Sequence, residues 1–115
     1  MHKYEIRVSQ HIDTEGVEIT RKMQEAKNAL KELAEGYEFL LPTDKKVHGS
    51  LIFWKEICKG LHELYGEGTQ AVEAVNNIIT IFDNGGAVRE STLIQVKDAI
   101  NQTATEHRDL QQMAA

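Results

Sequence analysis

Apolar residues recur every three or four positions along three long segments of the chain, and this spacing predicts α-helices. The first helix is expected over residues 17–41, ahead of Pro42, which a helix interior does not accommodate. Its apolar positions are Ile19, Met23, Ala26, Leu30, Leu33, Tyr37 and Leu40. The alternating steps of four and three are typical of a coiled-coil seam.

A second helical segment is expected over residues 49–83, where an apolar seam and a parallel stripe give a wide apolar face, as in a helix with two neighbours. The seam is Leu51, Trp54, Cys58, Leu61, Tyr65, Gly68, Val72, Val75, Ile79 and Phe82, and the stripe is Ile57, Leu64, Ala71 and Ile78. Gly66 and Gly68 together disfavour a helix by about 2 kcal/mol, yet the seam keeps its phase across them. Two interpretations stay open: one long helix, straight or kinked, in which Gly68 allows close approach of another backbone, or two helices that meet at 66–68, the second capped by Thr69.

The stretch Asn84-Gly85-Gly86 predicts a turn, because these residues readily take positive φ. A third helix is expected over residues 88–113, with Ser91 or Thr92 as its N-cap. Its seam is Leu93, Val96, Ile100, Thr103, His107 and Leu110. Because the seam becomes polar at Thr103 and His107, we expect its far end to fray or to need a partner.

The N-terminal residues follow a different pattern. Apolar and charged residues alternate from Lys3 to Val8, which predicts a short strand or an extended arm over residues 1–16. Residues 17–115 are expected to form a single helical domain. The predicted fold is all-α, an elongated helical hairpin or three-helix bundle with antiparallel neighbours, because the connections are short.

Composition narrows the class of protein. The chain has 115 residues, 41% of them hydrophobic, and a formal net charge of −5, which fits one soluble globular domain. The basic residues are scattered, so nucleic-acid binding is not predicted. No apolar run is long enough to span a membrane, and the N-terminus lacks the apolar core of a signal peptide. We expect a cytoplasmic protein or, alternatively, one secreted without a cleaved signal peptide.

The residues that carry chemistry form no recognisable motif. Cys58 is the only cysteine, and with His62 it is interpreted as a packing pair rather than a zinc site. The sequence from His62 to Gly66 begins like the zinc-protease motif but lacks its second histidine. The acidic residues Glu32, Glu35 and Glu38 are interpreted as a solvated face. We therefore expect no enzyme activity, no cofactor and no metal.

The wide apolar face predicts a surface for a protein partner. The candidate interface residues are Phe53, Trp54, Ile57, Leu64, Ile78 and Phe82. Adjacent helical positions diverge by about 100°, so Trp54 is expected in the core. Phe53 then either covers the end of the bundle or stands as an exposed aromatic anchor.

The turn before these aromatics resembles a known pattern. Val47-His48-Gly49, followed by Phe53 and Trp54, resembles the Trp-x-Gly turn of the small helical-hairpin proteins of type VII (ESX-type) secretion and of the small partners of LXG toxins. Val47 stands where that family has tryptophan. The resemblance implies a helical hairpin that pairs with another helical protein and is associated with type VII secretion.

The expected function is therefore that of a non-enzymatic interaction module, such as an adaptor, a chaperone or a small partner subunit. It would bind another helical protein or form an oligomer. The alternative is a small inhibitory or immunity-type protein, for example phage-encoded, that blocks a target enzyme. A helical bundle that binds a small ligand or a metal is a third alternative.

Overall fold

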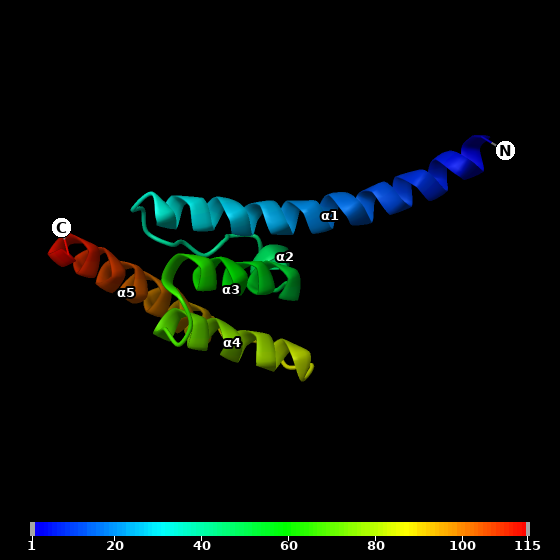
Figure 1. The fold of residues 1–115 in the computed structure, drawn as a ribbon. Coiled ribbons are helices and arrows are strands. Elements are labelled where there is room, and N and C mark those ends of the chain that lie inside the picture. The colour runs from blue at the N-terminus through cyan, green and yellow to red at the C-terminus, as the bar shows by residue number, and fades with distance from the viewer. Residues whose placement is uncertain (1, 115) are drawn as a thin grey trace.

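The protein is all-α, as predicted, over the residues that the computed structural model describes: the backbone of residues 2–114 and the side chains of residues 16–113. Within that range the helices are α1 (His2–Ala34), α2 (Lys45–His48), α3 (Leu51–Tyr65), α4 (Gln70–Asp83) and α5 (Glu90–Ala114). Figure 1 shows α1 on one side of α3, with α4 and α5 on the other. The overall dimensions are 66 × 32 × 23 Å.

The predicted extended arm over residues 1–16 is wrong from residue 2 onward, because these residues belong to α1. No strand with which an extended arm could pair occurs over residues 2–114, so the backbone groups of such an arm would be left to water. A helix satisfies those groups within one segment. The alternation of apolar and charged residues near the N-terminus therefore gave the wrong element.

Helix α1 ends at Ala34 and not at residue 41, as the seam had suggested. Gly36 takes a φ of +101°. Its amide donates to the Leu33 carbonyl at 3.1 Å, and the Tyr37 amide donates to the Glu32 carbonyl at 2.9 Å. These two bonds form a Schellman motif, the common helix ending with glycine at C′. The apolar spacing continued past Gly36 although the helix did not.

The second helical segment is divided, so the two-helix alternative is the correct one. Gly66 and Gly68 have φ values of +86° and +77°, a region that favours glycine. The Thr69 hydroxyl then accepts from the Val72 amide at 3.2 Å and caps α4. The heptad spacing across the turn has no structural counterpart, because Gly68 is exposed and α3 and α4 are separate helices that pack on the same core.

Helices α1 and α3 run parallel, which corrects the expected hairpin between the first two long segments. Lys27, Leu30 and Ala34 lie beside Glu56, Gly60 and Leu64, so residue numbers rise together along the two helices. Residues 35–50 return the chain to the start of α3, with α2 on the way (Figure 1). Val47-His48-Gly49 therefore lies in α2 and its C-cap, within a crossover. The helices α3, α4 and α5 are antiparallel in succession.

The core lies around α3. Its fully buried large side chains are Trp54, Phe39, Phe53, Leu33, Ile57, Leu61, Ile78, Ile100, Val47 and Val75. Gly60 lies at the crossing of α1 and α3, where an added Cβ would overlap the Leu30 side chain. Close approach of two helices thus occurs at Gly60, and not at Gly68, which is exposed in a turn.

Candidate interaction surfaces

Most of the predicted interface residues lie inside the protein. Phe53, Trp54, Ile57 and Ile78 have no exposed surface. Leu64 and Phe82 are half-buried. No partner can reach the first four on the folded chain, so the interpretation of Phe53 as an exposed anchor is wrong.

The burial of both aromatics follows from the position of α3. Because α1 covers one side of this helix and α4 and α5 cover the other, adjacent residues that diverge by 100° are both covered. The rings of Phe53 and Trp54 meet edge to face, with centroids 5.0 Å apart. The Trp54 indole N–H donates to the His48 carbonyl at 2.7 Å, which ties α3 to the last residue of α2.

The polar residues in the seam of α5 have partners within the chain. The Thr103 hydroxyl accepts from the Ala71 amide at 3.1 Å, so it satisfies one of the free N–H groups at the start of α4. The His107 ring packs on Tyr65, with ring centroids 5.0 Å apart. Thr103 and His107 thus find their partners at the start of α4 and the end of α3, and they do not require the outside partner that the sequence had suggested.

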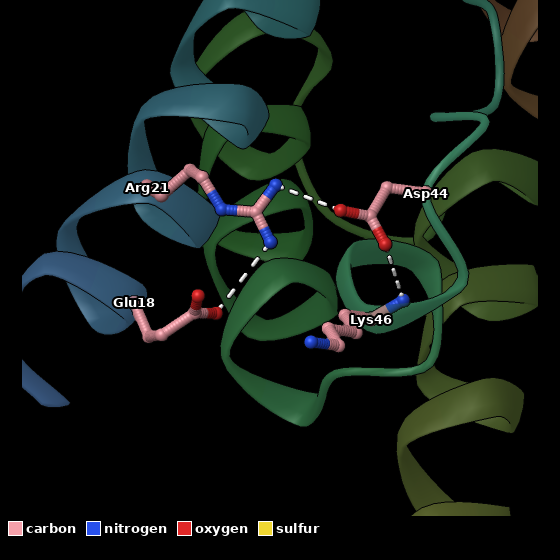
Figure 2. A network of polar contacts seen from close by, with 4 residues as sticks. All are labelled: Glu18, Arg21, Asp44 and Lys46. Atoms are coloured by element: carbon pink, nitrogen blue, oxygen red, sulfur yellow. Dashed lines mark hydrogen bonds and ion pairs between the residues drawn. The ribbon is translucent and has the colours of Figure 1, made fainter. Parts of the chain in front are cut away.

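A polar network joins α1 to the start of α2 (Figure 2). Arg21 donates to the Asp44 carboxylate at 2.8 Å, and Asp44 also accepts from the Lys46 amide at 2.9 Å as the N-cap of α2. A second guanidinium nitrogen of Arg21 lies 3.5 Å from Glu18. The bond from the Lys46 amide, and then the bond from Arg21, lower the pKa of Asp44. The bond to Asp44 raises the pKa of Arg21.

A hollow of about 250 Å³ lies where the ends of α1 and α3 meet α5. Tyr65, His107 and Arg108 line it, but each is engaged. The Arg108 guanidinium donates to the Leu33 carbonyl at 3.3 Å and so helps to end α1. Burial raises the pKa of Tyr65, an effect that the nearby Arg108 partly offsets. These contacts serve packing and helix capping.

The single cysteine is placed for packing. The Cys58 thiol lies 3.4 Å from the Asn76 side-chain oxygen, to which it donates. Burial raises the pKa of Cys58, which keeps the sulfur protonated and weakly nucleophilic. Over the described residues, no group of three or more His, Cys, Asp or Glu residues could hold a metal ion.

An extended segment between α1 and α2 presents two large apolar side chains that the seam had assigned to a helix. Tyr37 and Leu40 are 64% and 63% exposed. Between them, Phe39 is buried, and its backbone is held by α5: the Phe39 amide donates to the Asn101 side-chain oxygen at 2.7 Å, and the Asn101 amide group donates to the Phe39 carbonyl at 3.0 Å. These two hydrogen bonds anchor the segment to α5.

Carboxylates surround this apolar pair. Glu32, Glu35 and Glu38 line a hollow of about 410 Å³ together with Tyr37 and Leu40. Sequence reasoning noticed the three acidic residues but missed the surface. The signal was Gly36, since a helix that ends there turns Tyr37 and Leu40 out of the seam.

The helix ends present further apolar side chains. On α1, Val17 is 63% exposed and Ile19 is 45% exposed. Leu110 and Met113 are exposed near the end of α5. Figure 1 shows that the N-terminal half of α1 and the last turns of α5 project beyond the other helices. Within residues 2–114, no helix has both the length and the apolar character needed to cross a membrane.

Comparisons with known proteins gave no relative. No protein-family model matches the sequence, and neither the curated proteins nor the solved structures contained a significant match.

Proposed function

We propose that this protein is a non-enzymatic helical interaction module that binds another helical chain through the projecting half of α1. The observation that carries the proposal is that α1 extends well past its neighbours (Figure 1) while Val17 and Ile19 remain exposed on it. An adaptor, a chaperone or a small partner subunit would use such a helix in this way.

The energetics of helices support this role. Helix α1 has 33 residues and α3 has 15, so at about 1.5 Å per residue α1 is about twice as long as the helix it packs against. A helical segment of about 12–15 residues without tertiary contacts is marginally stable in water. Val17 and Ile19 are two residues apart and point to different sides of α1. A helical partner that contacts both sides of the projecting turns would remove this apolar surface from water and stabilise those turns.

The end of α5 adds a second apolar contact of the same kind. Leu110 and Met113 are three residues apart, so they share one face of that helix. Their exposure at a projecting end supports a partner that contacts helices, because apolar side chains spaced three or four apart pack into the grooves of a neighbouring helix.

The experiment is affinity capture with the tagged full chain from its native lysate, read by mass spectrometry, beside the double variant Val17→Asp, Ile19→Asp. We expect a stoichiometric helical partner with the native chain and its loss with the variant. The control is Ile94→Asp on α5, an apolar position that is 45% exposed, as Ile19 is, and it should leave capture unchanged.

Analytical ultracentrifugation of the purified native chain and of the same double variant tests whether the protein self-associates through these residues. A dimer that the Val17→Asp, Ile19→Asp variant dissociates would identify the partner as a second copy. A monomer that captures no protein, or capture that the α1 variant does not reduce, would contradict the proposal. A captured enzyme that loses activity on binding would point instead to an inhibitor.

A further inference from the structure

The segment between α1 and α2 has one edge of its backbone occupied and the other open. The Asn101 side chain bonds both the N–H and the C=O of Phe39, as a neighbouring strand would. In an extended chain, the N–H and C=O groups of the residues on either side point the opposite way. Within the described part of the chain, the backbone groups of Glu38 and Leu40 form no hydrogen bond.

From Glu38 to Leu41 the side chains follow the same two-residue period, whereas Tyr37, two residues before Phe39, is exposed. Phe39 is buried and Leu41 half-buried, while Glu38 and Leu40 are exposed. Alternate burial is the pattern of a strand with one covered face. The segment therefore behaves as a single strand laid against the helices, held in place by Asn101 and by the Gly36 helix ending, with an edge available for pairing.

We propose that this segment docks an extended, basic peptide of a partner protein, which adds to it as a second strand. The backbone of the peptide would pair with Glu38 and Leu40, in the mode known as β-augmentation. In a strand, Tyr37 and Leu40 lie on opposite faces. The apolar side chains of the peptide would therefore cover Tyr37, and the apolar stems of its basic side chains would lie over Leu40. Its lysine or arginine residues would face Glu32, Glu35 and Glu38 across the hollow of about 410 Å³.

The charge of the surface selects the partner. Glu32, Glu35 and Glu38 all contribute to the rim of the hollow, and no lysine, arginine or histidine lines it. An acidic peptide would bring like charges together, which disfavours binding. The inference rests on the proposed function only in requiring a protein partner, since it uses a surface distinct from the projecting half of α1.

The test is an NMR titration of the full, ¹⁵N-labelled chain with the synthetic peptide Lys-Val-Lys-Val-Lys-Val. We expect saturable shifts centred on the amides of Glu38 and Leu40, and binding that weakens as salt is added, because screening reduces the attraction between exposed charges. The charge-reversed peptide Glu-Val-Glu-Val-Glu-Val should give no saturable shift. Equal binding of the two peptides would overturn the proposal.

Backbone pairing is tested separately with a variant of the same basic peptide. In this variant, the alternate backbone N–H groups that would donate hydrogen bonds to the protein are methylated. Methylation removes N–H donors and leaves the charge intact, so binding should fall at least about tenfold. Undiminished binding of the methylated peptide would exclude strand addition.

Two variants locate the site on the protein. Tyr37→Ser with Leu40→Ser should raise the Kd about tenfold, as removal of apolar contact residues commonly does, whereas Ile94→Ser, an exposed apolar position on α5, should not. Glu32→Gln, Glu35→Gln and Glu38→Gln together should abolish the salt dependence. The matched control replaces the exposed Glu73, Glu90 and Asp98 by their amides.

Thermal unfolding of each variant checks that the fold is retained, which we expect because every substituted side chain is exposed. The titration requires no native partner. A negative titration would therefore overturn this inference and leave the result of partner capture as it stands.

Discussion

The two halves of α1 differ in what surrounds them. The C-terminal half packs on α3 at Gly60, buries Ala26 and Leu33, and is joined to α2 through Arg21 and to α5 through Arg108. The N-terminal half projects from the molecule. Both halves carry apolar residues, so apolar content alone did not decide which half would be covered.

What separates them is the position of the first tertiary contact. The Arg21–Asp44 pair lies where α2 begins, and α3 follows directly. Residues of α1 after Arg21 therefore run beside α3, whereas residues before it run past the end of α3. Burial in this helix depends on where its neighbour starts, which the pattern within α1 does not encode.

The largest expected contrast between the two halves comes from truncating an apolar side chain in each. Leu33→Ala removes a fully buried side chain and should lower the free energy of unfolding by about 2–5 kcal/mol. Val17→Ala, at an exposed position, should change it by no more than about 0.5 kcal/mol. Urea denaturation of the two variants measures both values, and equal effects would contradict the contrast.

The crossing of α1 and α3 gives the next largest effect. Gly60→Leu would force Leu30 and the α1 backbone away from α3, at a cost of about 1–3 kcal/mol. The control is Gly16→Ala in the same helix as Leu30, where an added Cβ meets no atom within 4 Å. That change should stabilise α1 by about 0.5–1 kcal/mol, since alanine is the better helix former. If both substitutions lowered the free energy of unfolding, the expected contrast between the two positions would be wrong.

A smaller effect is expected at the long-range contact that holds the extended segment. Asn101→Ala removes both hydrogen bonds to Phe39 and should lower stability by about 1–2 kcal/mol. Gln102→Ala, which loses only an exposed bond to Glu106, is the matched control. The amide of Phe39 should also exchange with deuterium faster in the Asn101 variant. An unchanged exchange rate would mean that the hydrogen bonds from Asn101 do not hold the segment in place.

The smallest effect concerns pH and the Arg21–Asp44 pair. The pKa of Asp44 is lowered in the folded protein, so the unfolded chain takes up a proton at a higher pH than the folded one. The resulting stabilisation is complete above the ordinary pKa of aspartate, about 4, and is lost as the pH falls through the folded value. Asp44→Asn should remove this part of the acid dependence of unfolding. If the free energy of unfolding of the variant fell with acid pH just as that of the native chain does, the role given to Asp44 would be wrong.

Much of the fold was predictable because helices follow local rules. The apolar spacing of α3, α4 and α5, the turn at Asn84-Gly85-Gly86 and the cap at Thr69 all appear in the sequence. The end of α1 was equally local, but the apolar spacing at Tyr37 and Leu40 concealed the effect of Gly36. The parallel direction of α3 was not predictable, because it depends on where a crossover of about 16 residues, 35–50, takes the chain.

The candidate surfaces were harder to predict than the fold. The largest and most regularly spaced apolar residues, such as Phe53 and Ile57, were the natural candidates for an interface and became the core instead. Exposure of Tyr37 and Leu40 depends on the bond from Asn101 to Phe39, which joins residues 62 apart in sequence. A contact over that separation leaves no periodic signal in the chain.

The one-sided packing of α1 also has a consequence for the order in which the molecule opens. Helices α3, α4 and α5 are joined by tight turns and share most of the buried side chains, whereas α1 lies mainly against α3 and reaches it through a crossover. Elements with fewer buried contacts open at lower free energy than the core. We therefore expect slow hydrogen exchange to persist in α3, α4 and the first turns of α5 after the amides of α1 have exchanged, so that α1 is the earliest helix to unfold.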